Sequence, residues 1–268
     1  MKDIRKEKQI KGKIIPLRFD YMFTNIFNNP KNIEILENFI SCYLEIPLKE
    51  IKGNLTLQSR ELIIENKKEK NKQVDLILKL GENKINIELN NNFTEGIIER
   101  NVIYACNIHG RQLKYGDNNY SNITSLIQIN LNASKKTKTN NLIERYVLTE
   151  EKTGNKLSKK IIIDVINLLM YDKKCYTLRE EKLARWCKVI MTESMTDLKE
   201  TLGDDLMEER AKETLIEEVN KYSTDDEVVA LYSAYSREEL ERNTVLEDER
   251  KEARESGFKE GKEKGIKE

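Results

Sequence analysis

The stretch VDLILKLGENKINIELN, residues 74–90, has an alternating apolar run on each side of the short segment GEN. Alternation with period two predicts two β-strands that each bury one face, because successive side chains of a strand point to opposite sides of a sheet. A tight turn around Glu82 and Asn83 would pair these strands antiparallel. The face opposite the apolar one then carries Asp75, Ile77 and Lys79 on the first strand and Asn86, Glu88 and Asn90 on the second.

Asp75 and Glu88 are the clearest candidates for a metal-binding or catalytic site in this hairpin. In the expected register Ile77 lies opposite Glu88 and Asn90 lies opposite Asp75. Asp75 and Glu88 are then diagonal neighbours, with backbone positions about 7–8 Å apart. Two carboxylates and a backbone carbonyl suit Mg²⁺ or Mn²⁺, which can polarise a phosphoryl oxygen and activate water. The alternative interpretation is a pair of surface acids on a half-solvated face, balanced by neighbouring lysines.

The segments on both sides of the hairpin predict a mixed α/β domain. Phe19, Phe23 and Phe27 recur every four residues, as on one face of a helix, and Pro30 ends that pattern. From about Leu178 onward the pattern becomes helical to near the end of the chain. The expected helices of the front portion cover residues 17–30, 32–44 and 94–115, and its further strands cover 55–65, 123–131, 142–151 and 159–170.

The charges divide unevenly along the chain although they sum to zero. Lysine and arginine total 47, as do aspartate and glutamate. Residues 1–200 contain 35 basic and 26 acidic residues, whereas residues 201–268 contain 12 basic and 21 acidic ones. A basic front portion is compatible with a polyanionic partner.

Several classes of protein find no support in the sequence. No apolar run reaches the length of a membrane-spanning helix, and the first residues have no apolar core of a secretory signal. The four cysteines form no CxxC pair, which favours reduced thiols and a cytoplasmic location. Neither GxxxxGK[ST] nor GxGxxG occurs, so we expect no nucleotide cofactor. His109 is the only histidine, which makes a catalytic triad hard to build.

The hairpin and its surroundings resemble the PD-(D/E)XK nuclease superfamily. More closely, they resemble the recombination-promoting nuclease (Rpn) family, also described as PD-(D/E)XK nuclease family transposases. The resemblance covers about residues 17–170 and extends weakly to the Gly-spaced charged tail. It rests on RFDYMFTNIF at 18–27, NIEL at 86–89, the helix with Arg100 and Tyr104, the turn at Gly116 and Tyr120, and LIQINL at 126–131.

This resemblance implies an α/β restriction-endonuclease-like core, with a central mixed sheet flanked by helices and followed by a C-terminal helical region. The expected segments are a basic lead-in at 1–16, a nuclease-like domain at 17–177, a charged helical region at 178–256 and a Gly-spaced tail at 257–268.

The family pattern also implies roles for individual residues. Asp75 and Glu88 would hold Mg²⁺ or Mn²⁺ together with the backbone carbonyl of Leu89. The position two after the glutamate is usually lysine in the superfamily and commonly glutamine in this family, but here it is Asn90. Asparagine can orient a water molecule by a hydrogen bond but carries no charge.

Five further residues are expected to support the site. Arg100 and Lys79 are candidates to supply the missing positive charge, and Tyr104 accompanies Arg100 in the family's helix. Lys72 precedes Asp75 where the family often has a lysine. Asp20 either supports the site or caps its own helix.

The implied function is Mg²⁺-dependent hydrolysis of DNA, associated through the family with recombination, mobile elements or phage defence. The alternative is a catalytically degenerate scaffold that binds DNA or a protein partner, and a third option is an interaction protein acting through its charged helices. The C-terminal helices could also form a homodimer. Their acidity suggests autoinhibition, in which case deletion of residues 201–268 would strengthen DNA binding. Two lysine-rich turns are either solvated or, if both flank the acidic face, would contact phosphates. They contain Lys67, Lys68, Lys70 and Lys72, and Lys135, Lys136 and Lys138.

Overall fold

The protein consists of two compact units, residues 1–220 and residues 221–268. The computed structural model describes residues 12–62, 72–92, 94–113, 116, 119–134, 141–172, 174–175 and 177–265. In this described part, every helix is too short or too polar to cross a membrane. The lysine-rich turns expected to contact phosphates lie outside the described residues, except for the backbone of Lys72.

A six-stranded mixed sheet forms the centre of the first unit, in the order β1-β4-β5-β6-β8-β7. The central strands β5, β6 and β8 run parallel, while β1, β4 and β7 pair antiparallel at the two edges. The strands are β1 Leu55–Leu57, β4 Leu76–Leu80, β5 Asn83–Asn90, β6 Leu126–Asn132, β7 Ile143–Val147 and β8 Ile161–Asn167. A separate two-stranded ladder joins β2 Glu61–Leu62 to β3 Lys72–Gln73.

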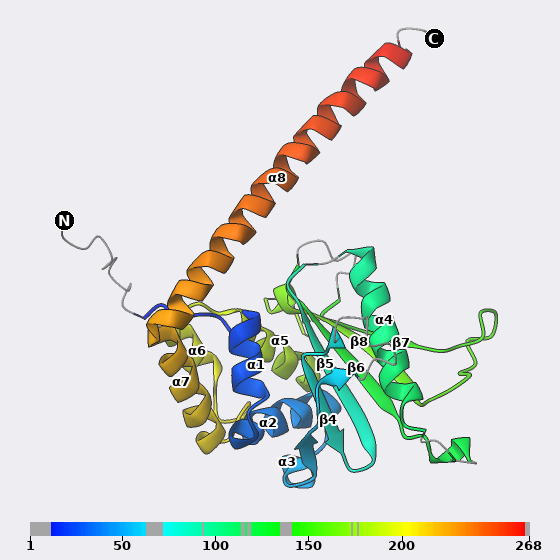
Figure 1. Ribbon diagram of the computed structural model, residues 1–268, viewed down its shortest axis with the longest axis vertical. Helices are drawn as coiled ribbons and strands as arrows, with labels where there is room; N and C mark the ends of the chain where they lie inside the picture. The colour runs from blue at the N-terminus through cyan, green and yellow to red at the C-terminus, as the bar shows by residue number, and fades with distance from the viewer. Residues whose placement is uncertain are drawn as a thin grey trace, which may run out of the picture. The chain divides into compact units, whose positions relative to one another are not determined.

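Helices cover both faces of this sheet, as the α/β pattern predicted (Figure 1). The helices α1 and α2 lie on one side and α4 lies on the other. The described helices are α1 Asp20–Phe27, α2 Ile33–Leu44, α3 Leu48–Ile51, α4 Glu95–Gly110, α5 Leu178–Met191, α6 Met195–Thr201, α7 Glu209–Thr224 and α8 Asp226–Gly265, with 3₁₀ turns η1 Pro30–Asn32, η2 Tyr120–Asn122 and η3 Leu168–Met170.

The register of the β4–β5 hairpin differs from the expected one by two residues. Leu80 pairs with Asn83, so the turn consists of Gly81 and Glu82. Gly81 has a φ of 56°, a left-handed conformation that glycine adopts without strain and that a two-residue hairpin loop requires. Ile77 consequently lies opposite Asn86, and the prediction that it lies opposite Glu88 is wrong.

The first unit extends beyond the boundary expected near residue 178. Trp186 of α5 is 1% exposed, and its ring packs edge to face on Phe39 of α2 at 5.3 Å between centroids. Leu215 of α7 is also fully buried. The burial of these apolar side chains shows that α5 and α7 belong to the same unit as the sheet.

The charge division is smaller at the observed boundary than at residue 200. Residues 1–220 contain 37 basic and 33 acidic residues, a net charge of +4, and residues 221–268 contain 10 and 14, a net charge of −4. The acidic residues of 201–220 therefore belong to the same unit as the basic front portion.

A buried carboxylate ties the sheet to α2. Asp164 of β8 is fully buried and accepts two short hydrogen bonds from Arg145 of β7, at 2.9 Å from Nε and 2.7 Å from Nη2. The Tyr43 hydroxyl of α2 donates to the same carboxylate. Burial and the Asp164 charge raise the pKa of Tyr43, so this phenol stays protonated as a donor.

We expect Asp164→Ala to lower the free energy of unfolding by about 3 kcal/mol, because it leaves Arg145 and Tyr43 without their shared acceptor. Tyr43→Phe removes one hydrogen bond only and should cost about 1 kcal/mol. Urea unfolding followed by the fluorescence of Trp186, the single tryptophan, measures both. A smaller loss for Asp164→Ala than for Tyr43→Phe would contradict this interpretation.

Candidate active site

The β4–β5 hairpin brings Asp75 and Glu88 directly together. The backbone N–H of Asp75, just before β4, donates to Oε1 of Glu88 at 3.3 Å. The backbone N–H of Leu89 donates to Oδ2 of Asp75 at 2.7 Å. Each acid therefore contacts the other strand's backbone. The two are adjacent across the hairpin instead of diagonal, as a consequence of the observed register.

Both acids hold their protons more tightly than usual. Glu88 is 2% exposed, and burial, followed by the neighbouring Asp75 charge, raises its pKa to about 8. Burial also raises the pKa of Asp75, while the Leu89 N–H, Arg60 and Arg100 partly oppose the rise. Burial thus disfavours the charged forms of both acids, and a bound cation would favour them.

Asn90 lies in this site, and its side-chain amide forms hydrogen bonds with neighbouring side chains. Its Nδ2 donates to Oδ1 of Asn132 on β6 at 3.0 Å. Its Oδ1 accepts from Nη2 of Arg100 at 2.8 Å and from Nδ2 of Asn101 at 3.5 Å. One Nδ2 hydrogen remains beyond the Asn132 contact, so Asn90 has little capacity left to orient a water molecule.

Arg100 of α4 provides positive charge beside the acids. Its charge lowers the pKa of Asp75, Glu88 and Asp20, against the larger effect of burial. Its guanidinium lies over the Tyr104 ring, 5.6 Å from the centroid. Burial raises the pKa of Tyr104, which is therefore a protonated donor at neutral pH.

Asp20 approaches the acid pair from the start of α1. Phe19 occupies the N-cap position, and the Asp20 carboxylate instead accepts a hydrogen bond from Nδ2 of Asn91 at 3.0 Å. Asn91 also donates to the carbonyl of Arg18 at 2.8 Å. Burial and the charge of Asp75 raise the pKa of Asp20. The start of α1 is thus held against the segment that follows β5.

The two candidate lysines are placed differently. Lys79 forms an ion pair with Glu82 at 3.5 Å, at the turn end of the hairpin and four residues from Asp75. The structure therefore does not bring Lys79 into the acid pair. Lys72 lies in β3 opposite Leu62, and its side chain lies outside what the structure describes.

A row of buried amides next to the acids was missed by the sequence analysis. Asn86 donates to Oε1 of Gln128 at 2.7 Å and to Oε1 of Glu88 at 3.1 Å. Gln128 in turn donates to Oδ1 of Asn130 at 3.0 Å. The alternating polar residues Gln128, Asn130 and Asn132 of this strand were the available signal. These amides hold the Glu88 carboxylate in place.

The donor set fits a hard divalent cation. Within the described residues, no three His, Cys, Asp or Glu side chains gather as ligands. The carboxylates of Asp75 and Glu88 are therefore the acidic ligands at this site, and the Leu89 carbonyl stays a predicted third ligand. Mg²⁺ is commonly bound by one or two carboxylates and keeps several waters. A cation bound here would offset the burial that raises the pKa of both acids.

We expect Glu88→Gln to stabilise the metal-free protein at alkaline pH. Because the folded-state pKa of Glu88 is about 8, above its ordinary 4.5, its stability contribution is present below about pH 4.5 and is lost as pH rises through 8. Glutamine keeps an acceptor for Asn86 without the charge, and should gain about 2 kcal/mol at about pH 9. Urea unfolding in EDTA between about pH 5 and about pH 9 measures this.

The matched control is Glu82→Gln, which removes an acid that is 81% exposed in the turn of the same hairpin. It should leave the pH dependence of the wild type unchanged. Parallel stability curves for the wild type and Glu88→Gln would contradict the raised pKa of Glu88.

Comparison with protein families identifies the chain. The family model described as PD-(D/E)XK nuclease family transposase matches residues 17–249. The match includes the six-stranded sheet, both helical layers and the first part of α8. Comparisons with curated proteins and with solved structures gave no match. The family resemblance and the expected fold are thereby confirmed: the chain belongs to the PD-(D/E)XK nuclease family transposases and has their mixed α/β architecture.

Proposed function

We propose that the protein is a Mg²⁺- or Mn²⁺-dependent endonuclease that hydrolyses DNA phosphodiester bonds. The observation that carries the proposal is the contact of Asp75 and Glu88 across the hairpin, in a site that raises the pKa of both. Family membership supports the same reaction. The connection to recombination, mobile elements or phage defence is part of this proposal.

Each residue of the site has a proposed part in the reaction. Asp75, Glu88 and the Leu89 carbonyl would hold the cation, which when bound polarises the phosphoryl group and lowers the pKa of water. Arg100 lies where it can pair with a phosphate oxygen and stabilise the charge that develops on it. Asn90 holds the Arg100 guanidinium through its Oδ1 and so positions that charge.

Arg100 thus replaces the usual lysine only in part. It supplies positive charge from α4, whereas the superfamily's lysine would extend from β5 beside Glu88. A guanidinium is a poor general base at neutral pH, so activation of water would depend on the bound cation. Asp20 belongs to the proposed site as a positioning residue that joins α1 to Asn91.

We expect the full-length protein to nick supercoiled plasmid DNA with Mg²⁺ or Mn²⁺ but not with EDTA. Asp75→Ala and Glu88→Ala should each reduce the rate by about a hundredfold or more, because each removes a ligand of the cation. Gel electrophoresis of the plasmid measures nicking. Glu82→Ala, which removes an exposed acid from the same hairpin, should cleave as the wild type does.

The alternative function is a degenerate scaffold that binds DNA or a protein partner without cleavage. The observation that favours it is the engagement of Asn90, whose amide bonds to Asn132 and Arg100. In the plasmid experiment, salt-sensitive DNA binding without nicking would support this alternative. The absence of both nicking and binding would reject both functions.

The proposed autoinhibition by the acidic tail is best tested by deleting residues 221–268. A deletion from 201 would remove Leu215 and other buried residues of the first unit. The remaining chain has a net charge of +4, so we expect tighter DNA binding at low salt and a smaller difference at high salt. Fluorescence anisotropy with labelled duplex DNA measures this binding, and unchanged or weaker binding by a folded truncation rejects autoinhibition.

Sedimentation of the full-length protein and of the truncated protein tests the proposed dimer through α8.

A further inference from the structure

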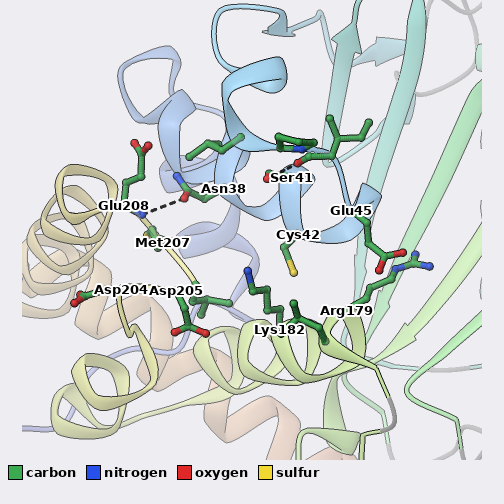
Figure 2. A pocket seen from close by; sticks show the side chains of 15 residues that line it. Asn38, Ser41, Cys42, Glu45, Arg179, Lys182, Asp204, Asp205, Met207 and Glu208 are labelled. Atoms are coloured by element: carbon green, nitrogen blue, oxygen red, sulfur yellow. Dashed lines mark hydrogen bonds between the residues drawn. The ribbon is translucent and has the colours of Figure 1, made fainter.

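A pocket lies in the first unit, apart from the acid pair, and Figure 2 shows the side chains that line it. Its volume is about 430 Å³, which is within the range of small-molecule sites. Its walls come from the second half of α2, the start of α3, the first turns of α5 and the turn at 204–208. None of the residues proposed for catalysis lines it.

Most of the acids around this pocket already have cationic partners. Three of the four lining acids form ion pairs with basic residues that do not line the pocket. The fourth, Glu45, is exposed at the end of α2. The three pairs are Asp204 with Lys212, Asp205 with Arg185, and Glu208 with Lys52.

The two lining cations are not neutralised in this way. Within the described part of the chain, neither the Arg179 side chain nor the Lys182 side chain forms a hydrogen bond or an ion pair, and the buried Nε of Arg179 has no acceptor. The Arg179 guanidinium lies over the ring of Tyr43, 5.3 Å from the centroid. In Figure 2 the Lys182 ammonium points toward Cys42. Buried donors without acceptors are uncommon in folded proteins.

Apolar side chains form the remaining wall. They come from α3, α5 and the turn at 204–208, and include Leu48, Leu178 and Met207. The pocket is therefore larger than an inorganic anion needs, and its lining combines charged and apolar side chains. A concave site of this kind suits an amphipathic small molecule better than the extended backbone of a duplex.

We propose that this pocket binds a small organic phosphate, with the phosphate between Arg179 and Lys182 and the organic part against Leu178 and Met207. A phosphate dianion can pair with both cations, and the arginine fork can donate two parallel hydrogen bonds to it. The proposal is independent of cleavage at Asp75 and Glu88.

Titration calorimetry of the full-length protein with phenyl phosphate tests the proposal, in EDTA so that no cation bridges phosphate to the acid pair. We expect saturable binding that is tighter than that of inorganic phosphate, which lacks the apolar part, and of phenol, which lacks the charge. Lys182→Gln and Arg179→Gln should each weaken binding about tenfold or more. Arg179→Gln also removes the contact of the Arg179 guanidinium with the Tyr43 ring. If this variant unfolds, Lys182→Gln still tests the proposal.

The control is Lys188→Gln, which changes an exposed lysine of the same helix that does not line the pocket. This variant and Asp75→Ala should bind phenyl phosphate as the wild type does. No saturable binding, equal affinity for phenol, or equal weakening by Lys188→Gln would overturn the proposal. Displacement of phenyl phosphate by a short DNA duplex would also overturn it, because the cations would then serve the DNA backbone.

Discussion

The pairing register of β4 and β5 is the constraint on which the candidate active site depends. Side chains alternate across a sheet, so a shift of one residue would place Asp75 and Glu88 on opposite faces. The turn at Gly81 and Glu82 sets this register, and the positive φ of Gly81 lets the turn close. Since β5 also pairs with β6 from Lys84 to Asn90, the position of Glu88 is set by the centre of the sheet and not by a loop.

On the face of the sheet that carries Asp75 and Glu88, neighbouring donors and one cation partly stabilise the buried acid pair. Desolvation opposes the charge on Asp75 and Glu88, and their proximity adds repulsion. Amide donors from Asn86 and the backbone compensate in part, and Arg100 adds a positive charge from α4. These donors do not fully offset desolvation and repulsion, so the charged acid pair lowers the stability of the fold. Such a cost in stability is typical of functional sites. Arg100 therefore brings a positive charge to the acid pair from α4, whereas β5 has the uncharged Asn90 two residues after Glu88.

The opposite face of the sheet serves a different purpose. There Asp164 forms an ion pair with Arg145 and accepts a hydrogen bond from Tyr43, and these contacts connect β7, β8 and α2. Tyr43 also supports the Arg179 guanidinium at the phosphate pocket proposed above. A carboxylate with all its partners present stabilises the fold, whereas the acid pair on the other face has a deficit of positive charge. The contrast separates the structural acid from those with a proposed chemical role.

The sequence by itself determined the strands and helices around residues 74–90, the faces of the hairpin and the family, because periodicity and short motifs are local properties of the chain. It also pointed to Asp75, Glu88 and Arg100, which the structure brings together. Only the tertiary structure decided the hairpin register, the engagement of Asn90 by Asn132 and Arg100, and the extension of the first unit to residue 220. Each of these depends on a turn conformation or on contacts between segments far apart in the chain, and a single sequence contains no local signal for them.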